Sequence, residues 1–190
     1  MKALILNGRR AGERELDSVQ EALLAELGGR GWETEAIWLR DVPLAYCNGC
    51  FECWTTTPGV CTIRDAGGDL ARAWIQSDLT VLLTPVTFGG YSAELKKALD
   101  RTICLVSPFF TRVAGEVHHR RRYVRYPALL AIGSLPEPEP EEEVIFHKLV
   151  RRNALNMHVP AFASGIVYTG DGEWARRCLE RLLDRLARAA

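Results

Sequence analysis

Residues 78–101 read DLTVLLTPVTFGGYSAELKKALDR, and this stretch decides the fold. Residues 79–83 form a short run that is apolar except for Thr80 and ends at Thr84-Pro85, as expected of a buried strand. Two glycines follow, and residues 91–105 then show the apolar spacing of a helix. A buried strand that leads through a turn into a helix is the unit from which covered parallel sheets are built.

The same alternation extends through the rest of the chain. We expect further strands at 3–6, 33–39, 128–132 and 162–168, and further helices over 16–27, 65–76, 141–156 and 172–189. Because the strands are continuously apolar, they predict a parallel sheet with helices on both faces. Five strands joined by right-handed crossovers are most simply arranged in the flavodoxin-like order 2-1-3-4-5. We therefore expect an α/β, flavodoxin-like fold, with residues 1–190 in a single domain.

Composition and charge exclude several functional classes. The 190 residues include 24 basic and 24 acidic side chains, so the formal net charge is zero. This balance argues against a nucleic-acid partner or an anionic membrane surface. No apolar run is long enough for a membrane helix, and the N-terminus does not resemble a signal peptide, so we expect a cytoplasmic protein.

The predicted topology indicates where a ligand would bind. In open α/β sheets the crevice lies beyond the carboxyl ends of the strands, where the first and third strands are neighbours. The loop at 84–92 offers backbone groups at two glycines and an aromatic wall at Phe88, which suits a flat polar ring such as a flavin. The alternative is a plain turn before a helix capped by Ser92, with Phe88 in the core.

Four cysteines form a second candidate site. Cys47, Cys50, Cys53 and Cys61 have the spacing C-x2-C-x2-C-x7-C within one predicted loop, at 46–61. Four closely spaced thiolates can hold an iron–sulfur cluster. Zinc, a thiol redox pair and unmetallated thiols are the alternatives. Cys104 and Cys178 lie on predicted helices, where we expect them to be small buried hydrophobes.

Two stretches resemble a known family. Residues 46–65 (YCNGCFECWTTTPGVCTIRD) look like the compact cysteine motif of iron–sulfur flavoproteins, and residues 78–101 resemble the same NADPH-dependent FMN reductase branch of the flavodoxin-like superfamily. The resemblance implies an FMN-containing oxidoreductase or electron-transfer flavoprotein that uses NAD(P)H as co-substrate and a small-molecule electron acceptor. It also implies a homodimer or homotetramer, and a possible [4Fe-4S] cluster on the four cysteines of the loop. No residue is assigned as catalytic.

The resemblance also assigns flavin-binding residues. It places the flavin ring against Thr84, Pro85, Val86, Thr87, Phe88 and Gly89, and position alone adds Gly133 and Ser134 after the fourth strand. Relatives hold the FMN phosphate with hydroxyl groups in the first loop, where this chain instead has Gly8, Arg9, Arg10, Arg14 and Ser18. Arginine pairs bidentately with phosphate, and the helix N-terminus that follows attracts anions. Three acidic residues in the same loop oppose this binding.

A basic stretch within residues 108–127 completes the candidates. It contains His118, His119 and several arginines with interleaved aromatics, and we interpret this arm as a solvated or subunit-contacting segment. A nucleotide-stacking surface is the alternative. On the preceding helix, we expect helix-surface or interface ion pairs at Glu94, Lys97, Asp100 and Arg101. A flavin-free metal- or thiol-binding module on the same scaffold is the second functional hypothesis.

Overall fold

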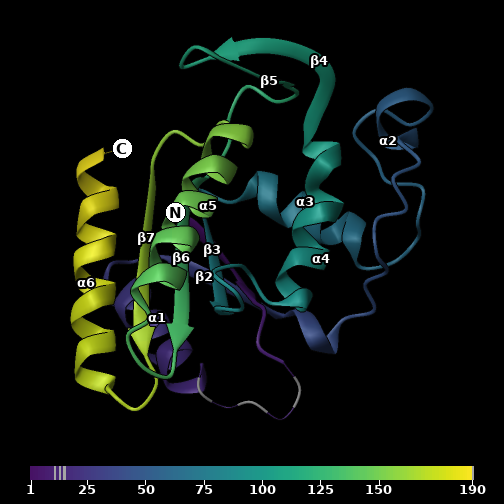
Figure 1. The fold of residues 1–190 in the computed structure, drawn as a ribbon. Coiled ribbons are helices and arrows are strands. Elements are labelled where there is room, and N and C mark those ends of the chain that lie inside the picture. Colours follow the sequence, from purple (N-terminus) through teal and green to yellow (C-terminus); the bar gives the residue numbers. More distant parts are fainter. Residues whose placement is uncertain (11, 13, 15, 190) are drawn as a thin grey trace.

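The computed structural model describes residues 1–10, 12, 14 and 16–189. Its main sheet has five parallel strands in the order β2-β1-β3-β6-β7 (Figure 1). These strands are β1 (Lys2–Asn7), β2 (Glu33–Trp38), β3 (Leu79–Pro85), β6 (Ala128–Leu135) and β7 (Phe162–Tyr168). Counted within this sheet alone, the order is 2-1-3-4-5. The predicted fold class is therefore confirmed.

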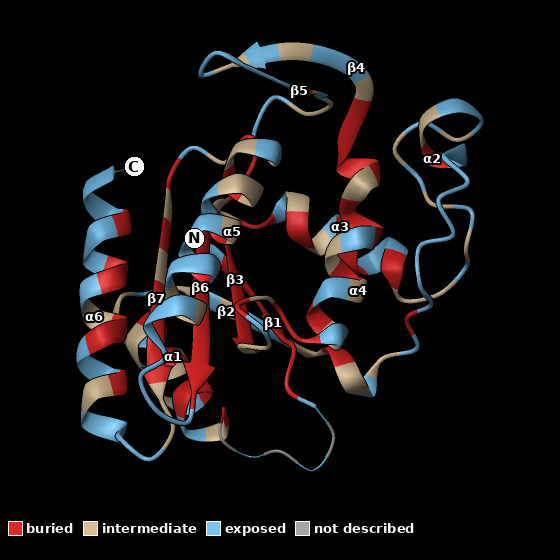
Figure 2. Ribbon diagram, viewed as in Figure 1, coloured by how far each residue is buried: buried red, intermediate tan, exposed pale blue. Residues whose placement is uncertain are grey.

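Helices cover both faces of the sheet (Figure 1). One apolar core joins the sheet to α1 (Asp17–Gly29) and α6 (Gly172–Ala189), and the other joins it to α3 (Gly67–Gln76), α4 (Ala93–Arg101) and α5 (Pro140–Asn156). Alternate residues of β1, β3 and β6 enter opposite cores, so these strands are buried on both sides, as Figure 2 shows in red, whereas the edge strand β2 has no buried residue. In the described part of the chain, no helix combines the length and apolarity needed to cross a bilayer.

The connection after α4 differs from the prediction. The helix predicted over 91–105 ends earlier than expected: α4 stops at Arg101, and a 3-10 helix, η2 (Thr102–Leu105), follows it. The Thr102 hydroxyl donates to the Leu99 carbonyl at 2.7 Å, which satisfies an acceptor at the end of the helix.

The predicted arm is a β-hairpin. Strands β4 (Val106–Val113) and β5 (Glu116–Arg121) pair antiparallel and lie apart from the main sheet, at the top of Figure 1. Ala114 and Gly115 have φ values of 50° and 83°, as in the tight turns that match the twist of paired strands. The role expected for this arm in subunit contact stays a prediction. Two short elements, η1 (Leu39–Asp41) and α2 (Glu52–Thr55), lie between β2 and α3.

Replacing either of two glycines with alanine adds one methyl group, and we expect the two replacements to change the free energy of unfolding in opposite directions. A Cβ at Gly133 would lie 2.6 Å from Val86 Cγ2 and 2.7 Å from Ile166 Cδ1, whereas a Cβ at Gly28 in α1 has no neighbour within 4 Å. Gly133→Ala is expected to lower the free energy of unfolding by about 1–3 kcal/mol through overpacking. Gly28→Ala is expected to raise it by up to about 1 kcal/mol. Urea denaturation checks both, and equal effects of the two changes would contradict the packing described.

Candidate functional site

Three loops meet at the edge of the sheet where β1, β3 and β6 end, called here the carboxyl edge. Asn7 pairs with Leu83, and Pro85 pairs with Ser134, so these strand ends are level. Beyond them, the Gly8 N–H donates to the Leu83 carbonyl at 2.7 Å. The structure thus brings together the three loops that the sequence nominated for flavin binding.

Gly8 allows the first loop to lie against the start of α4. A Cβ at Gly8 would lie 2.7 Å from both Leu95 Cβ and Ser92 Oγ, so only glycine fits this approach. The Ser92 hydroxyl donates to the Gly8 carbonyl at 2.6 Å and accepts from the Leu95 N–H at 3.2 Å. Ser92 is therefore the N-cap of α4, as the plain-turn alternative expected, and it also fixes the first loop.

Thr84 supports the loop from inside. Its side chain is fully buried, and its hydroxyl donates to the Pro85 carbonyl at 2.9 Å while accepting from the Ser92 N–H at 2.9 Å. Val86 donates its N–H to the Ser134 carbonyl at 2.9 Å, which joins the β3 and β6 loops. The hydroxyl of Thr84 therefore stabilises the loop, and the groups that can face a ligand lie further along it.

Residues 87–90 form a tight turn. Thr87 and Gly90 exchange two backbone hydrogen bonds, of 3.0 and 2.8 Å, and Phe88 and Gly89 between them have φ values of 50° and 71°. Such values match a type I′ turn. The Phe88 side chain is 91% exposed, so the alternative that placed it in the core is wrong. An exposed aromatic ring thus lies at the carboxyl edge.

The arginines of the first loop have different environments. Arg10 is exposed, and its Nη2 donates to Thr87 Oγ1 at 2.8 Å, which links the first loop to the 87–90 turn. Arg9 is buried, pairs with Asp17, and lies 4.7 Å from the centre of the Trp38 ring. Arg9 therefore offsets the charge of Asp17, and its guanidinium is already engaged.

The remaining candidates in the first loop lie near the start of α1. Arg14 and Ser18 are exposed. Among the described residues, no side chain caps the N-terminus of α1, and the Asp17 N–H donates to the Arg14 carbonyl at 3.0 Å. The start of this helix favours an anion through the helix dipole. Glu13 and Glu15, two of the acidic residues expected to oppose phosphate, lie outside the described residues.

The four predicted ligand cysteines line one small cavity together with Arg101 and Ile103. We call it the cysteine cavity, and the chain that forms most of it, residues 46–64, the cysteine segment. Cys47 and Cys50 are exposed, Cys61 is half-buried, and Cys53 is buried on α2. Burial raises the pKa of the Cys53 thiol, and the three neighbouring cysteines raise it further.

The cysteines do not converge on one point. Among the described residues, no group of three or more His, Cys, Asp or Glu side chains is placed to hold a metal ion. A single zinc ion needs four ligands in a tetrahedron, with each cysteine sulfur about 2.3 Å from the metal. The four thiols that line the cavity are nevertheless the donor set of an iron–sulfur cluster.

Aromatic contacts attach the cysteine segment to the hairpin. The Trp54 Nε1–H lies between the carbonyls of Ile103 and Val106, at 3.1 and 3.0 Å. Its ring stacks on Phe51, with centroids 5.1 Å apart, and lies 4.6 Å from the ring of His119 on β5. The hairpin therefore supports the cysteine segment, a role that the sequence did not reveal.

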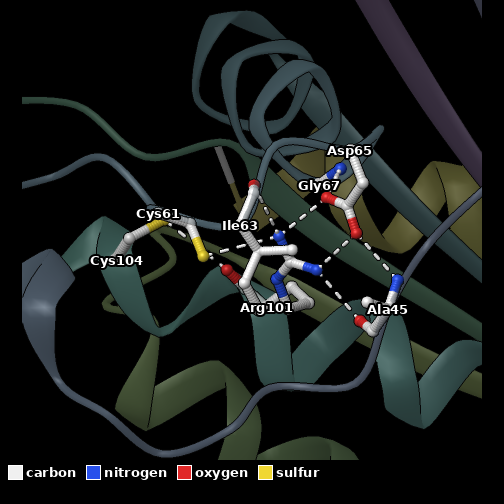
Figure 3. Close-up of polar contacts among 7 residues, drawn as sticks. All are labelled: Ala45, Cys61, Ile63, Asp65, Gly67, Arg101 and Cys104. Carbon is white, nitrogen blue, oxygen red and sulfur yellow. Dashed lines mark hydrogen bonds and ion pairs between the residues drawn. The ribbon is translucent and has the colours of Figure 1, made fainter.

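Arg101 is the functional residue that the sequence analysis misjudged. A helix-surface or interface ion pair was expected, but its side chain is fully buried within the chain and pairs with Asp65 (Figure 3). Hydrogen bonding to Arg101 lowers the pKa of Asp65 to about 2. The neighbouring pair of Glu94 and Lys97, at 2.8 Å, lies along α4 and is half-buried. No local sequence pattern indicates that Arg101 is buried, because its partner Asp65 lies 36 residues away in the sequence.

The two candidate sites lie at opposite ends of α4. Ser92 at its start contacts the first loop of the carboxyl edge, and Arg101 at its end lines the cysteine cavity. Nine helical residues rise roughly 13 Å. One helix thus connects the two sites through a single rigid element.

Comparison with known proteins identifies the family. The family described as NADPH-dependent FMN reductase matches residues 1–133, a range that contains the cysteine segment, α4 and the loops after β1 and β3. The chain belongs to this family. The resemblance noted in residues 46–65 and 78–101 is confirmed by this match.

Individual relatives within the family are more distant. The chain is 30% identical over 103 residues to an iron-sulfur flavoprotein of Archaeoglobus fulgidus, covering 54% of this chain and 46% of that protein. An iron-sulfur flavoprotein of Methanocaldococcus jannaschii is 40% identical over 84 residues, or 44% of this chain and 42% of that one. The chain thus spans about half the length of these curated relatives.

A solved structure supports the fold assignment. The NAD(P)H:quinone oxidoreductase from Methanothermobacter marburgensis has a TM-score of 0.69 and 16% sequence identity, covering 96% of this chain and 93% of that chain. At this level of identity the likeness concerns the fold alone. It agrees with the sheet order and with the helices on both faces.

The residues present fit the cofactor that gives the family its name. Arg10 offers a cation in the first loop, and the start of α1, which follows this loop in the sequence, favours an anionic phosphate. Arg9 neutralises Asp17, so that this carboxylate opposes an anion less. The exposed Phe88 ring and the turn around it offer an apolar surface for a flat ring. The carboxyl edge thus has the groups that FMN requires.

Proposed function

We propose that the chain is an NAD(P)H-dependent flavin oxidoreductase that binds FMN at the carboxyl edge. We further propose that it holds a [4Fe-4S] cluster on Cys47, Cys50, Cys53 and Cys61 and delivers electrons to a small-molecule acceptor. The observation that carries the flavin site is the Arg10–Thr87 contact of 2.8 Å, because it joins the phosphate-binding candidates to the ring-binding candidates. Membership of the FMN reductase family supports the same conclusion.

The proposal gives the residues of the carboxyl edge distinct tasks. Arg10, Arg14 and the start of α1 bind the phosphate group, and Ser18 adds a hydroxyl. The 87–90 turn binds the ring through backbone groups, and Phe88 excludes water from one face of it. Arg9 acts indirectly, because it pairs with Asp17 and keeps that carboxylate from repelling the phosphate.

The cysteine cavity supports a cluster through the chemistry of its donors. All four thiols line the cavity, and Arg101 beside them is a cation that favours bound thiolates. FMN held at the carboxyl edge would supply hydride acceptance and one- or two-electron release, and a cluster held by the four cysteines would supply one-electron exchange. The chain itself orients both groups and holds them at the two ends of α4.

The activity is tested by NADPH oxidation. Protein incubated with FMN and freed of excess cofactor is expected to oxidise NADPH in the presence of a quinone, followed by the loss of NADPH absorbance. Free FMN at the same concentration is the control. Colourless protein that contains stoichiometric zinc and is inactive after FMN incubation would instead support the flavin-free module.

A further inference from the structure

Arg101 makes more polar contacts than any other side chain considered above. It is the last residue of α4, and its side chain has no exposed surface. Its Nη1 and Nη2 donate to the two carboxylate oxygens of Asp65 at 2.7 and 2.8 Å (Figure 3). This paired geometry is specific to arginine, since lysine carries a single point charge.

The same guanidinium joins the two ends of the cysteine segment. Nη1 donates to the carbonyl of Ala45, just before the segment, at 2.9 Å, and Nη2 donates to that of Ile63, near its end, at 3.4 Å. Asp65 completes the closure, because it accepts from the N–H groups of Ala45 at 2.7 Å and Gly67 at 2.9 Å. The Arg101–Asp65 pair therefore closes the base of a loop that carries all four candidate ligands.

Gly67 provides the space that the Arg101 guanidinium occupies. A Cβ at Gly67 would lie 2.6 Å from Arg101 Nη2 and 2.8 Å from its Cζ. Glycine at this position is thus required by the buried guanidinium, and it lets the chain approach within contact distance. The pair is a built feature of the fold and involves α4, the start of α3 and both ends of the cysteine segment.

Arg101 also contacts a candidate ligand directly. Its Nη2 donates to Cys61 Sγ at 3.4 Å, and it lines the cysteine cavity (Figure 3). Its Nε–H is buried and has no hydrogen-bond partner among the described residues. The cavity is therefore lined by a cationic side chain that has one N–H group without a partner among the described residues. Hydrogen bonds to cysteine sulfur and nearby charge are among the factors that set the reduction potential of an iron–sulfur cluster.

We propose that Arg101 is the positioning residue of the cysteine site: it holds the cysteine segment closed through Asp65 and raises the reduction potential of the cluster through Cys61. This inference rests on the proposed cluster, but its first part concerns the chain without metal. A positive charge near the cluster favours the reduced, more negative state, and a negative charge opposes it.

The test compares Arg101→Gln with Asp65→Asn. Both break the pair, so amide hydrogen exchange in residues 46–64 of the metal-free protein is expected to become at least about tenfold faster in both, the effect of losing one charge-assisted hydrogen bond. Their effects on the reduction potential are expected to be opposite. Arg101→Gln removes the cation and lowers the potential, whereas Asp65→Asn removes the anion and raises it.

The expected change is at least about tenfold in the ratio of oxidised to reduced cluster at a fixed potential, or about 59 mV for one electron. Arg30→Gln is the matched control, because Arg30 pairs with Asp184 at 2.7 Å far from the cavity, and neither readout is expected to change. Should Arg101→Gln fail to fold, Arg101→Lys replaces it. Lysine keeps the charge but cannot reach Asp65 and Cys61 together, so the potential falls less and the exchange still accelerates.

Three outcomes overturn the proposal. Unchanged exchange in both variants shows that the pair does not hold the segment, and shifts of the same sign show that Arg101 acts only through structure. If neither variant changes the reduction potential of the cluster, the contact between Arg101 and Cys61 does not tune that potential. If the wild-type protein binds no iron, the cluster proposal fails, and hydrogen exchange in the metal-free protein alone decides whether Arg101 holds the segment.

Discussion

Replacing Cys50 with alanine is expected to abolish iron binding and to leave the free energy of unfolding nearly unchanged. Cys50 is exposed and lines the cysteine cavity, so the fold does not depend on packing of its side chain. A four-iron cluster requires four ligands, and an alanine supplies none. The measurement is iron and acid-labile sulfide per chain after anaerobic reconstitution, with urea denaturation to confirm the fold.

Cys104→Ala is the matched control for this experiment. Cys104 is buried near the site but does not line the cysteine cavity, and its thiol donates to the Arg101 carbonyl at 3.5 Å. Burial raises the pKa of the Cys104 thiol to about 11, so it stays neutral at physiological pH. The control is expected to keep its iron. Full iron content in Cys50→Ala, or its loss in Cys104→Ala, would show that the ligands are assigned wrongly.

Arg10→Ala is expected to weaken FMN binding by about tenfold to a hundredfold, the usual effect of losing a hydrogen bond to a charged group. The same change is expected to leave riboflavin binding nearly unaltered, because riboflavin has no phosphate for Arg10 to bind. Arg10 also donates to Thr87, so a variant that merely loosened the loops would weaken both ligands equally. Quenching of flavin fluorescence measures both affinities.

Arg30→Ala removes the same charge at the other end of the sheet, where Arg30 follows α1 and pairs with Glu26 and Asp184. It therefore controls for the general electrostatic attraction of an anion. We expect it to bind FMN as the wild-type protein does. Equal losses of FMN affinity in the two variants would exclude Arg10 as a specific phosphate ligand.

The sheet was predictable because its signals are local. Residues 79–83 are apolar except for Thr80, which identifies a strand buried on both faces, and β3 is indeed the central strand. The loops that meet at the carboxyl edge follow from topology alone, since parallel strands end at the same side. The four cysteines of the 46–61 loop were likewise predicted as a group from their short spacing, and they line one cavity.

Features that depend on distant partners were not predictable in this way. Arg101 follows Asp100 and Lys97 on a helix, so its local spacing indicated a surface pair, but its partner is Asp65. The hairpin lacked a clear alternation of apolar and polar residues, and its Ala114-Gly115 turn is not one of the common hairpin turn sequences. Phe88 is apolar and was assigned to the core in one interpretation, but the positive φ values of its turn project it outward.

We propose that one flavin mononucleotide binds where β1, β3 and β6 end, with arginine of the first loop at its phosphate. Calorimetric titration of the wild-type protein with FMN tests it most directly. We predict saturable binding of one FMN per chain with micromolar or tighter affinity, accompanied by quenching of flavin fluorescence. Neither heat nor quenching at micromolar concentrations would contradict the claim.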